Sequence, residues 1–481
     1  MSEPSAAAVR NTNVAGLVIA LLVAVFAFQL NASMLSPALA TMERELRTTT
    51  AQIGLSQTAF FTAAALFSLF LPRWGDLIGR RRVLSLMLLV TAVGCVVSAL
   101  APSVGVLFVG RVIQGVAGPV VPICLIMLRV QVPDPKLYAT LLGVLTAVNG
   151  GIAGVDALAG GWLAGTFGFR SIFWVMAAVC AIAVVAVRGA TVESTAVETP
   201  PMDWKGVAPL VVAIGAALVA FNQAGELATA NWVLVIVLLL VAAAAFAVFW
   251  RIEDRSPHPL VSTHYLRQRR TWALLSTTLL TMTGVFAIMN GLIPNLAQDT
   301  TAGPGIAADT VSWVTLTPYA LAGLFIGPVA GRLAGSFGYR RVLQVGLAGT
   351  VVGVGIAVLT AAAPSPGLLL FVSIFIGITY AGVSNIMLNG LGIVLSPEDN
   401  PGYLPGLNAG AFNLGAGISF AVLFAVDTLV STGSGARAGY TAGIVTGGIL
   451  VALALAVSVL IPRPDPSAVA ARIENAGPAA H

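Results

Sequence analysis

Long apolar runs recur along the whole chain, and they constrain the fold more than any other feature. Of the 481 residues, 58% are apolar and only 9% are charged, whereas soluble proteins carry about 25% charged residues. Each run has about 20 residues or more, which is enough for one helix to cross a bilayer. The runs are too long and too continuous for barrel strands. The sequence therefore predicts an all-α membrane protein.

The runs define fourteen expected membrane spans, separated by short polar segments and by two longer polar linkers at 188–205 and 251–270. The expected spans cover residues 14–36, 52–72, 83–101, 103–128, 138–166, 171–187, 206–223, 231–250, 272–296, 310–330, 342–362, 367–395, 403–428 and 438–461. An even number of spans puts both termini on one side of the membrane. If that side is the cytoplasm, inner segments hold 19 of the 24 lysines and arginines. Basic residues favour the cytoplasmic side, so we expect a multi-pass plasma-membrane protein with both termini inside.

Two related basic segments indicate an internal repeat. The first, Pro72 to Val83, reads P-R-W-G-D-L-I-G-R-R-R-V, and the second, Gly331 to Arg341, reads G-R-L-A-G-S-F-G-Y-R-R. We expect the first to be a short cytoplasmic loop, in which Asp76 can pair with Arg80 and Gly79 permits a tight turn.

Eight expected spans lie between the two segments, whereas a repeat of six-helix halves would place six there. The simplest account is two six-helix bundles with an extra helix pair between them, an arrangement of halves that many secondary transporters use. The expected domains are an N-terminal bundle at 14–188, an inserted helix pair at 206–250, a C-terminal bundle at 272–462 and a disordered cytoplasmic tail at 463–481.

The motifs resemble those of the major facilitator superfamily, and in particular its fourteen-span drug:proton antiporters, over roughly residues 14–462. Asp76, Gly79, Arg80 and Arg81 stand where that family's first signature has its functional positions. The segment Arg111-V-I-Gln114-Gly115 matches the R-x-x-Q-G signature of proton-coupled members. The resemblance implies two six-helix bundles, a gating role for the first segment and proton coupling that involves Arg111.

The fifth expected span departs from the antiporter pattern. Where that pattern reads G-P-x-x-G-G, this chain reads D-A-L-A-G-G, so that Gly160 and Gly161 remain but Asp156 and Ala157 replace the first two positions. A carboxylate inside a span costs about 2.5–3.5 kcal/mol on insertion scales and marks a candidate functional site.

Arg111 is the candidate partner of Asp156. Their expected depths differ by only about 3 Å at a rise of 1.5 Å per residue, so the two side chains can meet if their spans are neighbours. The pair has two interpretations: Asp156 carries a proton across the membrane, or the two groups form a static buried ion pair that fixes helix packing.

Other polar side chains within the spans are individually typical of helix–helix hydrogen bonding. Together they suggest a mainly apolar cavity with scattered hydrogen-bonding groups, suited to a small amphipathic ligand. The candidate cavity residues are Asn31, Gln114, Asn149, Asn290, Tyr319, Asn385 and Asn389. We expect Asp427, near the outer end of its span, to be a solvated cap.

The sequence lacks the motifs of several other classes of protein. It has no G-x-x-x-x-G-K-[ST] phosphate loop, no histidine and cysteine cluster of the kind that binds metal and no nucleophile–base pattern. We therefore expect no cofactor, no metal site and no enzymatic activity. The net charge of +5 is accounted for by basic inner loops, so a nucleic-acid partner is not expected.

Three functions remain as hypotheses. The main one is export of a small amphipathic drug or metabolite in exchange for protons. The second is proton-coupled uptake of a metabolite by the same fold, motivated by the altered fifth span. The third is a non-transporting membrane receptor or an integral membrane enzyme, which the absence of catalytic motifs does not support. The expected partners are a small-molecule substrate, protons and the lipid bilayer, with the protein acting as a monomer.

Overall fold

The structure is a computed structural model in which all secondary structure of the described residues is helical. The described residues are 14–132, 134, 137–138, 141, 144–145, 153–194, 202–224, 230–257, 259–397 and 403–463. Asn149 and the expected tail beyond residue 463 lie outside this set.

The N-terminal group of helices extends to residue 190. Its elements are α1 (Val14–Ser33), η1 (Ser36–Ala38), α2 (Leu39–Leu46), α3 (Thr50–Ile78), α4 (Arg80–Ala99), α5 (Val104–Gln114), η2 (Gly115–Ala117), α6 (Val120–Gln131), α8 (Ala153–Phe167) and α9 (Phe169–Ala190). A helix pair follows, α10 (Trp204–Ala224) and α11 (Trp232–Arg255), and then the short α12 (Thr263–Leu266).

The C-terminal group begins with α13. Its elements are α13 (Arg269–Ala287), η4 (Ile288–Leu292), α14 (Ile293–Gln298), η5 (Val311–Trp313), α15 (Leu316–Phe337), α16 (Tyr339–Ala362), α17 (Pro366–Ile376), η6 (Gly377–Ser384), α18 (Asn385–Val394), α19 (Tyr403–Ser434) and α20 (Ala436–Ser458). The elements η4 and η6 are π-helical segments that continue the helices on either side.

Thirteen helical segments within the described residues are long and apolar enough to cross a membrane. The remaining expected span, 138–166, falls partly on residues outside the described set, and α8 is its described part. The prediction of an all-α membrane protein is therefore confirmed, and this is a multi-pass membrane protein.

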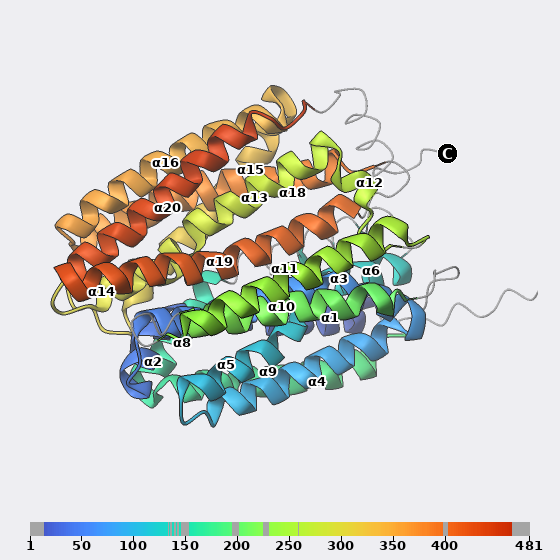
Figure 1. The fold of residues 1–481 in the computed structure, drawn as a ribbon, viewed down its shortest axis with the longest axis horizontal. Helices are drawn as coiled ribbons and strands as arrows, with labels where there is room; N and C mark the ends of the chain where they lie inside the picture. The colour runs from blue at the N-terminus through green and yellow to red at the C-terminus, as the bar shows by residue number, and fades with distance from the viewer. Residues whose placement is uncertain are drawn as a thin grey trace, which may run out of the picture.

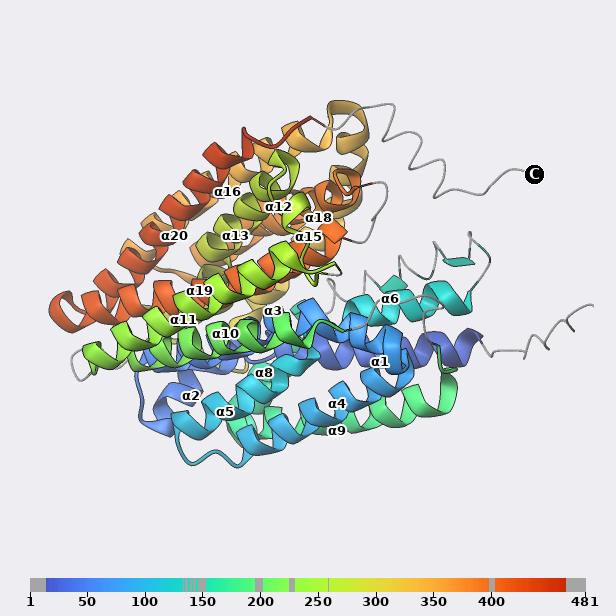
Figure 2. The same ribbon diagram turned by 45° about the vertical axis from the view of Figure 1, so that its right-hand side comes forward.

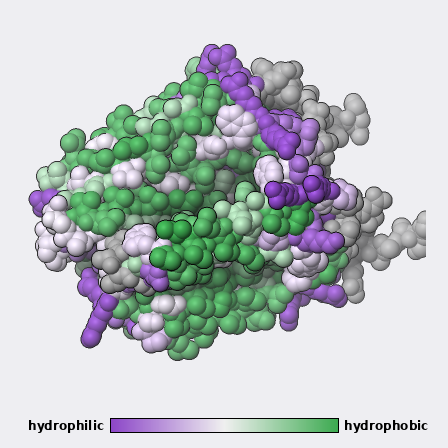
Figure 3. Space-filling view, viewed as in Figure 1, coloured by the Kyte–Doolittle hydropathy of each residue, from purple (hydrophilic) through white to green (hydrophobic). Residues whose placement is uncertain are grey.

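The two groups of helices lie side by side, and α10 and α11 pack against each other along one flank (Figures 1 and 2). We call the end that carries α2 and α14, on the left in Figure 1, the distal end. The opposite end, which carries α12 and the start of α4, is the proximal end. Hydrophobic side chains dominate the visible face between the two ends (Figure 3), as expected of a surface that faces lipid.

Glycine supplies four of the turns between antiparallel helices. Gly79, Gly168, Gly338 and Gly435 have φ values of 114°, 78°, 85° and 89° and stand between α3 and α4, α8 and α9, α15 and α16, and α19 and α20. Left-handed backbone of this kind is accessible to glycine without strain. Because the turns occur at corresponding places in the two groups, they extend the repeat that the basic segments indicated.

The expected loop at Pro72–Val83 is mostly helical. Helix α3 continues through Pro72 to Ile78, and α4 begins at Arg80, so the turn consists of Gly79 alone. A proline inside a membrane helix is tolerated because neighbouring groups satisfy the freed carbonyl. The local polar composition therefore did not indicate where the helix ends.

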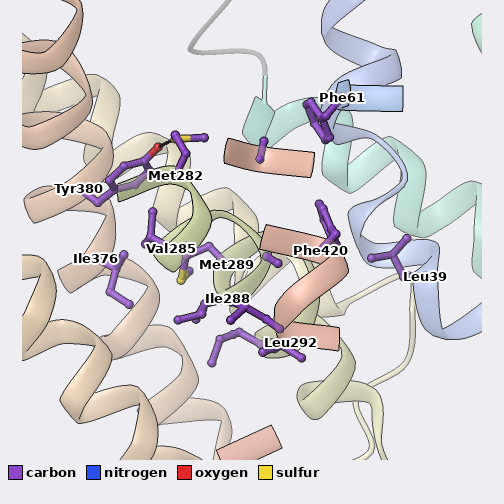
Figure 4. Close-up of a cluster of buried hydrophobic side chains, with 14 of the residues drawn as sticks. Leu39, Phe61, Met282, Val285, Ile288, Met289, Leu292, Ile376, Tyr380 and Phe420 are labelled. Atoms are coloured by element: carbon purple, nitrogen blue, oxygen red, sulfur yellow. Dashed lines mark hydrogen bonds between the residues drawn. The ribbon is translucent and has the colours of Figure 1, made fainter. Parts of the chain in front are cut away.

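The interior between the two groups is apolar and aromatic. In one buried cluster, Phe61 of α3 and Phe420 of α19 lie close to side chains of α13, η4 and the helix that carries Tyr380 (Figure 4). The hydroxyl of Tyr380 donates a hydrogen bond to the sulfur of Met282 at 2.6 Å. This cluster joins helices that are far apart in the sequence.

Candidate functional site

The buried carboxylate of Asp156 lies in the first turn of α8 and is 2% exposed. The hydroxyl of Ser33, at the end of α1, donates a hydrogen bond to Oδ2. The amide of Gln29, one turn earlier, donates to Ser33 Oγ at 2.9 Å. Within the described part of the chain, Oδ1 has no hydrogen-bond partner. Helix α1 therefore holds one oxygen of the acid and leaves the other free to bind a proton.

The guanidinium of Arg111 in α5 is fully buried and binds neutral groups. Both of its terminal nitrogens donate to the carbonyl of Asn31 at 3.2 Å. They also donate to the side-chain oxygens of Gln114 at 2.6 Å and Gln57 at 2.9 Å. The guanidinium carbon lies 4.2 Å from the centre of the Phe60 ring, a cation–π contact.

The expected ion pair between Arg111 and Asp156 is not formed in the structure. The five ion pairs among the described residues do not include it. The two groups have matching depths, but both turn toward α1: Arg111 contacts the carbonyl of Asn31 and Asp156 contacts Ser33. Helix α1 thus connects them in place of a direct contact.

The predicted cavity residues Asn31 and Gln114 belong to the polar network inside the N-terminal group. Gln114 donates to the carbonyl of Gly94 at 3.0 Å and to Ser98 Oγ at 2.7 Å. The Asn31 amide donates to the carbonyl of Ala27 at 2.8 Å. Both side chains are fully buried, so their hydrogen-bonding capacity is largely used within the protein.

The predicted cavity residues of the C-terminal group are distributed over three helical segments. Asn290 in η4 is 7% exposed; it donates to the carbonyl of Phe286 at 3.0 Å and accepts from Ser36 at 3.5 Å. Tyr319 in α15 is half-buried. In α18, the Asn389 amide donates to Asn385 Oδ1 at 3.1 Å. The structure thus does not gather the predicted set around one point.

Aromatic side chains that no sequence motif predicted meet where α3, α13 and α19 converge. The rings of Phe61 and Phe286 are 5.1 Å apart, and those of Phe286 and Phe412 are 6.3 Å apart. Phe61 and Phe420 stack with an interplanar angle of 9°. Phe286 and Phe412 are only half-buried. Phenylalanines at helical spacing are equally common in packed cores, so the sequence alone cannot distinguish such a junction from the core.

Helix α8 meets the C-terminal group directly beside Asp156. The hydroxyl of Thr317 donates to the carbonyl of Gly154 at 2.8 Å, and the hydroxyl of Ser312 donates to the carbonyl of Ala157 at 3.0 Å. The acid therefore lies on the stretch of α8 that binds α15 and η5. Any motion that separates the two groups at the distal end must break these hydrogen bonds.

A second distal contact joins α3 to α19. The Thr58 hydroxyl donates to the carbonyl of Gly417 at 2.7 Å, and the amide of Ala51 donates to the Thr428 hydroxyl at 3.1 Å. Gln298 of α14 adds a hydrogen bond to the carbonyl of Pro37 at 3.0 Å. The distal half of the interface is thus closed by hydrogen bonds between the groups.

Three acids lie near one another at the distal end. Asp427 is 3% exposed, contrary to the expected solvated cap, because α19 packs it against neighbouring helices. It interacts electrostatically with Glu43 and Asp299. Burial raises the pKa of Asp299, but hydrogen bonds from the Ala302 amide and from Thr301 outweigh burial and hold the pKa below its usual value.

The predicted gating residues cluster at the proximal end. Arg80 Nη2 lies 2.7 Å from Asp76 Oδ1, which forms the expected pair. Glu193, which belongs to the linker expected at 188–205, accepts a hydrogen bond from the Arg81 backbone N–H at 2.9 Å. A Cβ at Gly79 would lie 2.5 Å from the Glu193 carboxyl carbon. The turn is thus held by a residue from beyond α9, which no local pattern indicates.

The arrangement of two helical groups around buried polar and aromatic side chains is that of a secondary transporter. The chain belongs to the Major Facilitator Superfamily, which it matches over residues 21–420 and 274–480. In the part of the chain that the structure describes, no three histidine, cysteine, aspartate or glutamate residues are placed to hold a metal ion.

The names of individual relatives refer to different transported compounds. The uridine/deoxyuridine transporter of Lactococcus lactis subsp. cremoris is 61% identical over 455 residues, which cover 94% of this chain and 95% of that protein. The multidrug resistance protein Stp of Mycobacterium tuberculosis is 26% identical over 80% of this chain and 69% of that protein. The crystal structure of the nucleoside transporter NupG superposes with a TM-score of 0.61 at 16% identity, covering 92% of this chain and 98% of that chain.

Proposed function

We propose that this protein takes up pyrimidine nucleosides such as uridine and deoxyuridine across the cell membrane. The observation that carries the proposal is the 61% identity to a uridine/deoxyuridine transporter over nearly the full length of both chains. The expectation of drug efflux is wrong, because the multidrug relative is far more distant, at 26% identity. The expectation that survives is the second hypothesis, uptake of a metabolite by the same fold.

In this proposal, the aromatic junction between α3, α13 and α19 receives the nucleobase. Stacking of a base on an aromatic ring contributes about 1–3 kcal/mol. Phe286 and Phe412 are half-buried, so each has ring surface available for stacking. Asn290 lies one turn from Phe286, and its side chain can hydrogen-bond to the base or the ribose.

We propose that Asp156 couples nucleoside uptake to proton entry. Its free oxygen can be protonated, and its neighbours in α8 form the distal hydrogen bonds to Thr317 and Ser312. A neutral acid would stabilise the closed interface, since burying a charge costs more than burying the protonated group. Arg111 acts in this scheme through its contact with Asn31 in α1.

The membrane arrangement belongs to the same proposal. The basic residues favour a cytoplasmic proximal end with both termini inside, so the distal end faces outward. We retain the division into bundles at 14–188 and 272–462 with the helix pair 206–250 between them, the gating role of the Gly79 turn and a monomeric protein in the bilayer.

Radiolabelled uridine uptake into proteoliposomes tests the proposal. The purified protein should take up uridine faster than empty liposomes, and unlabelled deoxyuridine should compete, whereas a fluoroquinolone should not. Uptake should increase when the outside is more acidic than the inside. Absence of uridine uptake together with uptake or export of the fluoroquinolone would refute a nucleoside carrier.

A further inference from the structure

A pocket of about 290 Å³ lies at the proximal end, where α4 begins and α9 ends, and the proposed transport cycle gives no role to its residues other than Arg81. It is lined by Arg81, Arg82, Ser85 and Arg188. Its volume is near the lower end of the range of small-ligand sites, about 300–1,000 Å³.

The pocket carries an excess of positive charge. Three of its four lining residues are arginines, and among the described residues the carboxylate paired with them is that of Glu193, whose Oε2 lies 3.7 Å from Nε of both Arg81 and Arg82. One carboxylate cannot neutralise three guanidinium groups. The Arg82 side chain is 74% exposed, and Arg188 is also exposed, so both can turn toward a bound anion.

Ser85 provides an independent indication of a ligand. Its side chain is 1% exposed, and its Oγ has no hydrogen-bond partner among the described residues. A buried hydroxyl without a partner is costly. Because this hydroxyl lines a pocket with three arginines, an anionic oxygen bound there would accept its hydrogen bond.

Lipid-facing apolar side chains continue from the pocket along both helices. On α4, Leu86, Leu89 and Val93 are 42%, 48% and 52% exposed and follow Arg82 at helical spacing. On α9, Val185 and Ile182 are 73% and 58% exposed and lie one and two turns before Arg188. A ligand with an anionic head and long apolar chains would match both the pocket and this surface.

We propose that the pocket binds the phosphate of an anionic phospholipid, with Arg82, Arg188 and Ser85 around the phosphate and the acyl chains along α4 and α9. Basic pockets between membrane helices bind anionic headgroups, and guanidinium groups suit phosphate geometry. Glu193 approaches Arg81 and Arg82, and it also holds the Gly79 turn. A bound headgroup would therefore lie directly beside that turn.

Native mass spectrometry of the purified full chain, titrated with phosphatidylglycerol in detergent, tests the proposal. The variant carries Arg82→Gln and Arg188→Gln, which lie outside the predicted gating set. The matched control carries Arg332→Gln and Arg341→Gln, exposed arginines of the second basic segment. We expect the apparent Kd for the first lipid to rise about tenfold or more in the variant, a loss of about 1.4 kcal/mol, and to change less than about twofold in the control.

Two further arms separate the possible sources of the phosphate. Phosphatidylcholine should bind more weakly than phosphatidylglycerol, and millimolar inorganic phosphate should not displace the lipid. The variant Ser85→Leu, which fills the pocket and keeps every arginine, should also weaken binding. Wild-type affinity in both variants, equal losses in the control, equal binding of phosphatidylcholine or displacement by inorganic phosphate would each overturn the lipid site.

Discussion

Asp156 and Ser33 form the residue-scale contact on which the proposed coupling depends. The acid is 2% exposed and bonded through one oxygen only. A carboxylate in this setting pays a desolvation penalty that a bound proton removes. Since no cation pairs with Asp156 within the described residues, the proton is the simplest available source of neutralisation.

Replacing Asp156 with asparagine should abolish coupling to the proton gradient, while the protein still carries uridine across the membrane. A gradient of one pH unit supplies about 1.4 kcal/mol per proton, enough for about tenfold accumulation of uridine by the normal protein with one proton per nucleoside. In Asp156→Asn, the final ratio of internal to external uridine should fall to about one, while uridine exchange continues. Radiolabelled uridine in proteoliposomes with an imposed pH gradient measures both quantities.

The matched control is Asp309→Asn, which removes an exposed acid near the same interface. It should accumulate uridine as the unaltered protein does. Full accumulation by Asp156→Asn would eliminate this residue as the proton carrier.

At the scale of elements, α8 is the helix whose packing matters most, because it contacts α1 on one side and the C-terminal group on the other. Two adjacent glycines permit both contacts: a Cβ at Gly160 would clash with the carbonyl of Met34, and a Cβ at Gly161 would clash with the carbonyl of Ala308. Consecutive positions on a helix face different sides. Gly160 therefore allows the close approach to the N-terminal group, and Gly161 allows the close approach to the C-terminal group.

Gly161→Ala should therefore weaken closure at the distal end. Overpacking against backbone that cannot move aside costs about 1–3 kcal/mol, so the open fraction should rise by about fivefold or more. The readout is the rate at which a membrane-impermeant maleimide labels a cysteine placed at Ala308, which is only 8% exposed in the closed structure. The native Cys95, Cys124 and Cys180 are buried.

Gly215→Ala in α10 is the control, because nothing lies within 4 Å of a Cβ at that position. It should leave the labelling rate unchanged. Equal labelling in Gly161→Ala and the unaltered background would show that this contact does not limit opening.

At the scale of the whole molecule, transport requires the two groups to separate at one end and then at the other. The structure has its distal half closed by direct hydrogen bonds between α8 and α15 and between α3 and α19. At the proximal end, the segment before α12 contacts both groups: Pro259 accepts from Arg73, and Ser262 accepts from Tyr403.

A disulfide across the distal interface should stop the cycle. A Cβ at Gly165 would lie 3.3 Å from Cβ of Asp309, close to the 3.5–4.5 Å of natural disulfides. Oxidised Gly165→Cys/Asp309→Cys protein should lose more than about 90% of uridine uptake, because a covalent bond cannot open within the cycle. Reduction with dithiothreitol should restore uptake, as measured in proteoliposomes.

Each single cysteine variant should keep its uptake under oxidising conditions. If the oxidised double variant formed the disulfide and still transported uridine, the distal contact would not be a moving gate.

The sequence by itself determined the class, the approximate spans and the proximal turn. Runs of apolar residues leave few alternatives in a bilayer, where backbone polar groups must be satisfied within each helix. The Asp76–Arg80 pair was predictable because both residues are local, four positions apart on one helical face.

Only the tertiary structure decided which distant groups meet. Depth along a helix can be counted from the sequence, but rotation about its axis is set by packing with neighbours. That is why Arg111 and Asp156 lie at similar depths and yet both bind α1, and why the role of Glu193 at the Gly79 turn was not foreseen. The substrate was equally beyond composition, since the same scattered amides and aromatic rings suit a drug or a nucleoside. The proposal of a nucleoside rests instead on the 61% identity to a uridine/deoxyuridine transporter.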